Sequence, residues 1–128
     1  MNYTITKEFK FEASHQLVGH DGKCARPHGH SWRFIVELSS DQLIEGGAKA
    51  AMVHDYEDIK KEVDPVVSVY LDHWHLNDTL KTNRPTSEFI ARWIYEKLKP
   101  VLPLLCAVTV FETCTASCRY APRQEIEQ

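Results

Sequence analysis

Two segments in the first third of the chain alternate between apolar and polar side chains, which is the pattern of a strand with one buried face. In the first segment, TKEFKFEASH, the buried positions run from Phe9 through every second residue to His15. In the second, HGHSWRFIVEL, they run from His28 through His30 to Leu38. We therefore expect two half-buried strands whose buried faces carry histidines at one end.

The remainder of the chain predicts two helices and a further strand. The run Asp55 to Tyr70 is mostly helical in composition, and Pro65 is expected to end or kink this helix nearby. After a loop over residues 77–85, Thr86 can cap a second helix, whose apolar stripe stops before Pro100. The β-rich segment AVTVFETC then follows as a strand.

Length, composition and charge narrow the class of protein. The 128 residues are expected to form a single domain over residues 1–128, and 43% hydrophobic with 26% charged residues is typical of a globular protein. The net charge of -3 and the pI near 6.1 argue against a nucleic-acid partner. The sequence lacks an apolar run of about 20 residues and a signal-peptide core, so we expect no membrane partner and a cytoplasmic location. The four unevenly spread cysteines are expected to be reduced.

Three histidines are expected to meet where the first two strands join. A polar loop, residues 16–27, connects these strands, and antiparallel pairing would place His15 beside His28 and His30. A lone histidine on an apolar face is more often a core residue than a ligand. Three imidazoles that leave one position open are, however, a common arrangement for catalytic zinc, so their convergence favours a metal site.

Cys24, in the stretch CARPHGH, leaves two functions open. If its sulfur is a fourth ligand, the zinc site is closed and the protein is a structural or binding module. If its sulfur stays off the metal, a nearby Zn²⁺ favours the thiolate, which can act as a general base or nucleophile. A buried spectator thiol is a poorer explanation in so polar a loop.

An aspartate and a histidine are adjacent in LDHWHLND. Asp72 could orient and charge-stabilise His73, so that its imidazole moves protons. Adjacent side chains do not automatically bond to each other, however, and a solvated turn explains the pair equally well.

Glu112 is a carboxylate on an otherwise apolar strand face, which it shares with Val108, Val110 and Cys114. The polar edge of a strand is the simpler explanation. A partly buried carboxylate also matches the paired N–H groups at the edge of a pterin or a guanine. Glu112 is therefore a candidate for binding such a ring.

Taken together, the motifs resemble a known family. The stretches FEASH, CARPHGH, LDHWHLN, RPTSE and ETCTASC occur in this order from about Phe9 to Tyr120 and are similar to those of 6-pyruvoyl-tetrahydropterin and 6-carboxytetrahydropterin synthases. The combination is far more specific than His-Gly-His alone. The resemblance implies an α+β tunnelling fold, with a four-stranded antiparallel sheet, two helices on one face, and assembly through β-barrel trimers into hexamers.

The resemblance also implies roles for the candidate residues. The residues that would hold a catalytic Zn²⁺ are His15, His28 and His30. The residues that would take part in proton transfer are Cys24 as acceptor, Asp72 and His73 as a relay, and Glu112, which also anchors the pterin ring.

Three further residues are left without a role. Glu88, in RPTSE, could help to hold the pterin, but a glutamate in the first turn of a helix also suits the helix dipole. His54 and His75 are likewise unassigned.

Within the family, the three residues between the cysteine and His-Gly-His resemble the bacterial 6-carboxytetrahydropterin synthases of the 7-deazaguanine (queuosine) pathway. Pyruvoyl-forming members usually have a longer spacer. The resemblance therefore implies conversion of 7,8-dihydroneopterin triphosphate to 6-carboxy-5,6,7,8-tetrahydropterin, with release of acetaldehyde and triphosphate. The alternatives are a 6-pyruvoyl-tetrahydropterin synthase and a non-catalytic zinc-binding module.

Overall fold

A five-stranded sheet forms the centre of the computed structural model, which describes residues 3–123. The strands lie in the order β3-β1-β2-β4-β5 and are β1 (Tyr3–His15), β2 (His28–Ser40), β3 (Trp74–His75), β4 (Leu105–Thr113) and β5 (Ala116–Tyr120). Neighbouring strands pair antiparallel, except that β3 runs parallel to β1. The expected four-stranded antiparallel sheet is thus wrong by one strand, because the two-residue β3 pairs parallel to β1 and adds a fifth.

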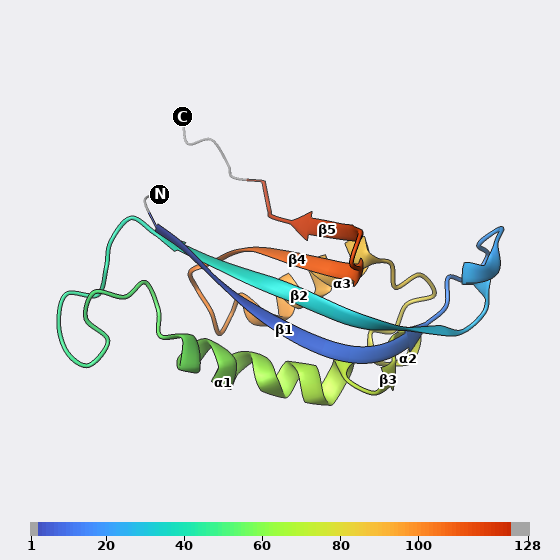
Figure 1. Ribbon diagram of the computed structural model, residues 1–128, viewed down its shortest axis with the longest axis horizontal. Helices are drawn as coiled ribbons and strands as arrows, with labels where there is room; N and C mark the ends of the chain where they lie inside the picture. The colour runs from blue at the N-terminus through green and yellow to red at the C-terminus, as the bar shows by residue number, and fades with distance from the viewer. Residues whose placement is uncertain (1–2, 124–128) are drawn as a thin grey trace.

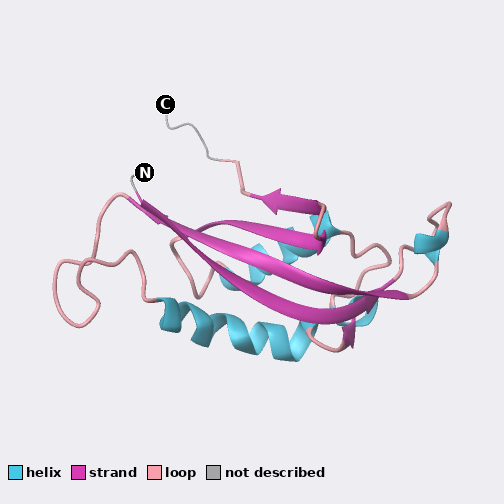
Figure 2. Cartoon of the chain, in the orientation of Figure 1, coloured by secondary structure: helices cyan, strands magenta, loops and turns pink. Residues whose placement is uncertain are grey.

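The helices cover one face of this sheet (Figure 1). The long ones are α1 (Tyr56–Val66), which continues as the π-helical segment η2 (Val67–Leu71), and α3 (Ser87–Leu98). Two short elements complete the set, the 3₁₀-helix η1 (Lys23–Ala25) and α2 (Leu76–Thr79). The two long helices lie on one face as expected, but α2 is a third helix that the expected pair did not include. Figure 2 shows how the loops join the helices to the sheet.

The core forms where these helices meet the apolar face of the sheet. Ile59 and Val63 of α1 and Ile90 and Ile94 of α3 are fully buried. They join the alternating residues of the strands in one cluster, which includes Phe9, Phe11, Trp32, Phe34, Val36, Leu38, Val108 and Val110. The alternation in the first two strands was therefore a correct guide to the buried face.

The strands β1 and β2 pair antiparallel along their whole length, from Tyr3 opposite Ser40 to His15 opposite His28. This register places the three histidines together at one end of the sheet, as predicted. The end of the sheet with the histidines is also where the loop of residues 16–27 crosses from one strand to the other.

Two local expectations need correction, whereas the expectation for Pro65 is confirmed. Pro65 lies in the last turn of α1, which ends at Val66 and is followed by the π-helical segment to Leu71. The short helix α2 occupies part of the region expected as loop, residues 77–85. Cys114 lies beyond the end of β4 and is exposed, so it does not share the buried face with Val108 and Val110.

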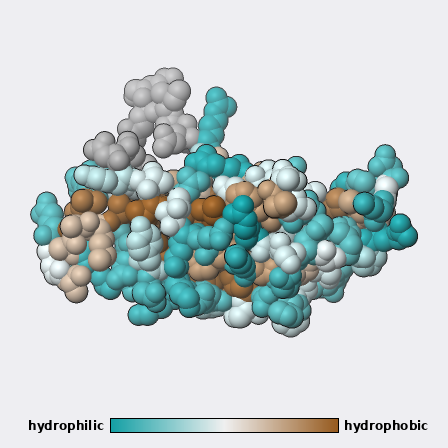
Figure 3. Space-filling model, viewed as in Figure 1, coloured by the Kyte–Doolittle hydropathy of each residue, from teal (hydrophilic) through white to brown (hydrophobic). Residues whose placement is uncertain are grey.

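The face of the molecule shown in Figure 3 is mostly hydrophilic, with hydrophobic residues showing in patches over its middle. Within residues 3–123, no helix is long and apolar enough to cross a membrane. All four cysteines are free.

Candidate active site

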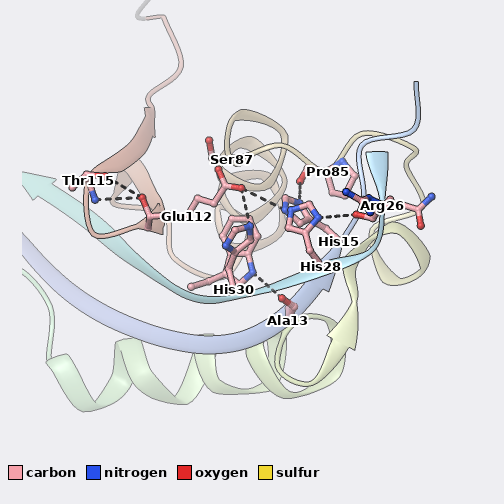
Figure 4. Close-up of polar contacts among 12 residues, drawn as sticks. Ala13, His15, Arg26, His28, His30, Pro85, Ser87, Glu112 and Thr115 are labelled. Atoms are coloured by element: carbon pink, nitrogen blue, oxygen red, sulfur yellow. Dashed lines mark hydrogen bonds and ion pairs between the residues drawn. The ribbon is translucent and has the colours of Figure 1, made fainter. Parts of the chain in front are cut away.

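Four side chains from three strands converge at one end of the sheet (Figure 4). They are His15 from β1, His28 and His30 from β2, and Glu112 from β4, and their nearest ligand atoms all lie within 4.8 Å of one another. The ring centroids of the histidines are 4.5 to 5.1 Å apart. The convergence of the three histidines is as predicted, and Glu112 joins them.

Backbone carbonyls fix the orientation of two of these imidazoles. His15 Nδ1 lies 2.8 Å from the carbonyl oxygen of Pro85, and His28 Nδ1 lies 2.8 Å from that of Arg26. Because a carbonyl oxygen can only accept, Nδ1 carries the proton in both rings and Nε2 is left with a free lone pair. The sequence gives no signal for these two contacts, since any residue supplies a carbonyl group.

The Nε2 atoms of His15 and His30 are buried and have no hydrogen-bond partner among the described residues. The carboxylate oxygen Oε1 of Glu112 lies 3.4 Å from the first and 3.1 Å from the second. A lone pair on His15 Nε2 and a carboxylate oxygen are both acceptors, so they cannot satisfy each other without a proton or a cation between them. A metal ion fits this arrangement, because it would satisfy both acceptors at once.

Burial also keeps these imidazoles ready to bind a metal. Desolvation lowers the pKa of His15, helped by the neighbouring His28 and opposed by the bond to Pro85 and by Glu112. Burial likewise lowers the pKa of His30, against the opposing effect of Glu112. Both rings are therefore neutral at neutral pH, which is the form that coordinates metals.

Cys24 lies beside this cluster but is not one of its four members. It sits on the short helix η1, is partly exposed, and lines a cavity of about 480 Å³ together with Lys23, Arg26, Pro27, His28, His30 and Glu112. The N–H of Leu17 donates to the carbonyl oxygen of Cys24 at 2.8 Å, and this bond closes the loop that carries Cys24. The thiol thus shares a cavity with the candidate metal ligands.

The predicted pair of Asp72 and His73 is formed. His73 Nδ1 lies 2.9 Å from Asp72 Oδ2, and the other carboxylate oxygen accepts the N–H of Glu12 at 2.9 Å. The bond from the Glu12 N–H is the main reason why the pKa of Asp72 lies below its usual value, and the contact with His73 adds to it. Asp72 is therefore ionised at neutral pH and is able to hold a proton on His73 Nδ1.

The backbone of His73 is in the left-handed region, with φ 65°. For a residue other than glycine this conformation costs about 1–2 kcal/mol. It is held in part by the N–H of His73, which donates to the carbonyl oxygen of Glu12 at 2.6 Å. The side chain is 78% exposed. Strained residues of this kind often belong to functional sites.

Within a single chain, His73 does not line the cavity that contains Cys24. His73 lines a second hollow with Glu12, Ser14, Ser31 and His75, while Cys24 and Glu112 line the first. His30 borders both. Glu12 and Ser14, which line the second hollow, lie on the face of β1 opposite to that of His15.

The three unassigned residues lie in different places. Glu88, in the first turn of α3, accepts a hydrogen bond from Ser87 Oγ at 2.8 Å. His54 lies far from the cluster, in the loop before α1, and His75 contacts Ser14. The Ser14 contact was not anticipated, because it depends on the pairing of β3 with β1.

Comparisons with known proteins find matches over nearly the whole chain. The family described as 6-pyruvoyl tetrahydropterin synthase matches residues 4–123. A 6-carboxy-5,6,7,8-tetrahydropterin synthase of Synechocystis sp. is 50% identical over 123 residues, which cover 94% of this chain and 95% of that protein. A protein of the same name from Haemophilus influenzae is 39% identical, over 92% of this chain and 98% of its own length.

A solved structure shows the same fold. The 6-pyruvoyl tetrahydropterin synthase of Caenorhabditis elegans superimposes with a TM-score of 0.80 at 30% identity, covering 94% of this chain and 96% of that one. The similarity thus extends over nearly the full length of both chains.

Proposed function

The chain belongs to the 6-pyruvoyl tetrahydropterin synthase family, and from this premise we propose that it is a zinc-dependent 6-carboxy-5,6,7,8-tetrahydropterin synthase. Its substrate would be 7,8-dihydroneopterin triphosphate, and its products the 6-carboxy pterin, acetaldehyde and triphosphate. The observation that carries the proposal is the cavity in which a thiol, Cys24, lies beside three imidazoles and a carboxylate poised for a metal. The 50% identity to a protein named for this activity favours it over the sister reaction.

The metal is proposed to be Zn²⁺, held by His15, His28 and His30. Imidazole nitrogens are preferred zinc ligands, and three of them leave a position for substrate. When bound, zinc would supply Lewis acidity toward the oxygens of the pterin side chain, making adjacent C–H and O–H groups easier to deprotonate.

Cys24 is proposed as the proton acceptor. Its sulfur lies in the cavity with the cluster, outside the group of four potential ligands, which supports the catalytic interpretation over that of a closed structural site. As a thiolate it would take a proton from the substrate side chain, and the cavity walls would hold that side chain within reach.

Asp72 and His73 are proposed to return protons to the substrate. Asp72 is ionised and holds His73 Nδ1, which leaves Nε2 of the exposed ring free to exchange a proton. Because His73 lies outside the cavity of Cys24, it would serve the cavity of a neighbouring chain rather than its own.

Glu112 is proposed to anchor the pterin. Its carboxylate is partly exposed in the cavity and can accept two N–H groups from the ring edge. Its contact with the histidines offers a second role, as an additional metal ligand.

Assembly into trimers that pair as hexamers is also proposed. Among residues 3–123, β3 covers only Ala13 and Ser14 on one edge of β1, and β5 forms the other edge of the sheet. Open edges of this kind can be paired between subunits. The free cysteines suit a reducing compartment such as the cytoplasm.

Incubation of the purified zinc protein with 7,8-dihydroneopterin triphosphate alone tests the proposal. We expect mass spectrometry to show 6-carboxytetrahydropterin, with equimolar acetaldehyde and triphosphate. A 6-pyruvoyl product without acetaldehyde would assign the protein to the alternative reaction. Unchanged substrate with a fully loaded metal site would support the remaining alternative, a non-catalytic zinc-binding module.

A further inference from the structure

The segment that carries His73 is held at both ends by side chains that hydrogen-bond to the backbone of β1 or of the residue that follows it. Asp72 Oδ1 accepts the N–H of Glu12 at 2.9 Å. Asn77 forms a reciprocal pair with Gln16, accepting its N–H at 2.9 Å and donating to its carbonyl oxygen at 2.8 Å. The two ties are made by Glu12 in β1 and by Gln16 just after its end, and the segment from Asp72 to Asn77 that they hold includes β3.

A third contact, between two side chains, lies between the contacts of Asp72 and Asn77. Ser14 Oγ and His75 Nδ1 are 2.9 Å apart, and both side chains are half-buried. The backbone pairing of β1 and β3 comprises only two residue pairs, Ala13 with Trp74 and Ser14 with His75. So short a strand has little backbone pairing of its own, and the Ser14–His75 bond adds a specific contact at its last pair.

This contact bears on the imidazole of His73, which lies two residues before His75. The ring of His73 is 78% exposed, so packing does little to hold it. Its position depends instead on the contact with Asp72 and on the left-handed backbone at φ 65°, which the bond from the His73 N–H to the Glu12 carbonyl oxygen holds only in part. A shift of β3 along or away from β1 would move that backbone and break the alignment of His73 with Asp72.

We propose that Ser14 and His75 are positioning residues for His73. Their hydrogen bond holds β3 in register on β1, which keeps His73 in its left-handed conformation with Nδ1 directed at Asp72. The inference rests on the proposed function in one respect, namely that His73 transfers a proton. It assigns a purpose to His75 that neither its sequence position nor the metal cluster provides.

Substitutions of His75 distinguish the effect of the hydrogen bond from the effect of side-chain shape. His75→Asn places an amide nitrogen near the position of Nδ1 and can keep the bond to Ser14. His75→Phe keeps a ring of similar size and loses the bond. Ser14→Ala removes the same bond from the other side, so it also serves if His75→Phe does not fold.

We expect His75→Phe and Ser14→Ala to lower kcat by about 10-fold to 100-fold with KM within about threefold, since a misplaced catalytic group costs rate more than binding. His75→Asn should stay within about threefold of the unmodified protein. The double variant should be no slower than either single variant, because both remove one interaction. His54→Phe, which removes an imidazole near the opposite end of β1, is the matched control and should leave kcat unchanged.

A measurement without substrate tests the same inference independently of turnover. Nitrogen-15 spectra of the His73 ring should show the proton on Nδ1 in the unmodified protein and in His75→Asn. In His75→Phe and Ser14→Ala the proton should move toward Nε2, with metal content unchanged.

An unaltered His73 tautomer in both of the bond-breaking variants would overturn the inference, and so would additive losses of kcat in the double variant. Failure of the proposed function would look different. In that case the unmodified protein would not convert the pterin, while the ring spectra would still report whether Ser14 and His75 position His73.

Discussion

Two backbone carbonyl groups fix the orientation of two imidazoles in the histidine cluster. Pro85 and Arg26 accept the Nδ1 protons of His15 and His28, so both rings direct Nε2 toward the centre of the cluster. Contacts of this kind raise the basicity of a ligand and prevent its ring from flipping. The cluster is thus preorganised for a metal by groups that are not themselves ligands.

The role of Cys24 can be separated from that of the histidines by metal analysis. We expect Cys24→Ala to retain about one zinc per chain and to lower turnover by about 10²-fold to 10⁴-fold, because a proton acceptor is lost. His30→Ala should lose zinc as well as activity. Mass spectrometry of the metal content measures both.

Cobalt substitution provides the control for this prediction. A cobalt protein with three imidazole ligands should lack the intense charge-transfer absorption of a thiolate ligand. If that band is present and disappears in Cys24→Ala, the thiol is a metal ligand and the catalytic interpretation is wrong.

Glu112 has two proposed roles, and a conservative substitution distinguishes between them. We expect Glu112→Gln to keep its zinc and to raise KM at least about tenfold, since charged hydrogen bonds of about 1.5–3 kcal/mol would be lost from the pterin edge. Glu112→Ala should be at least as severe. Loss of zinc in Glu112→Gln, measured by metal analysis, would instead make Glu112 a ligand.

Among the helices, α1 begins at an aspartate that also forms an ion pair with a lysine of the preceding loop. Asp55 is its N-cap and accepts the N–H of Glu57 at 2.8 Å, while Lys49 from the preceding loop bonds to the same carboxylate. The Lys49 contact is the main reason why the pKa of Asp55 lies below its usual value, followed by the bond from Glu57. The start of α1 is thereby tied to the loop that leads into it.

This lowered pKa predicts a dependence of stability on pH. Because the pKa of Asp55 is lower in the folded than in the unfolded protein, its contribution is complete above the unfolded pKa of about 3.9 and is lost as the pH falls through the folded value. Asp55→Asn can still cap the helix but should remove this part of the acid destabilisation. Urea unfolding between pH 3 and pH 7 measures the effect as a smaller slope of unfolding free energy against pH.

Asp41→Asn is the matched control for this measurement. Asp41 is exposed and forms no ion pair within residues 3–123. An equal change of slope in both variants would contradict the assignment to Asp55.

For the protein as a whole, the main question is how residues that line two separate cavities could act on one substrate. One chain places Cys24 in one cavity and His73 in another, yet both are needed for the proposed reaction. Subunits that pair along the open edges of their sheets could bring a thiol from one chain to an imidazole from the next. The proposed chemistry therefore requires an oligomer.

Subunit mixing tests this requirement. Light scattering should show a trimer or hexamer rather than a 14.8 kDa monomer. Cys24→Ala and His73→Ala chains, each strongly impaired alone, should regain activity when unfolded and refolded together, because some interfaces then combine an intact thiol with an intact imidazole. A monomer with full activity would contradict the shared site.

Much of the fold could be predicted from the sequence because it depends on local periodicity. The alternation from Phe9 to His15 and from His28 to Leu38 identified two strands and their buried faces, and Thr86 marked the start of α3. Side-chain direction alternates strictly along a strand, so the shared side of His28 and His30 also followed from their spacing. The strand β3 is too short for any such pattern.

The arrangement of the site depends on which strands become neighbours, and periodicity does not contain that information. Glu112 meets His15 and His30 because β4 pairs with β2 in a particular register, and His75 meets Ser14 because β3 pairs with β1. The sequence determined which residues face the core and which could bind a metal, since both follow from side-chain chemistry and spacing. The tertiary structure decided that the carboxylate joins the imidazoles and that Cys24 and His73 line separate cavities, because contacts between distant segments arise only when the strands pair and the helices pack against the sheet.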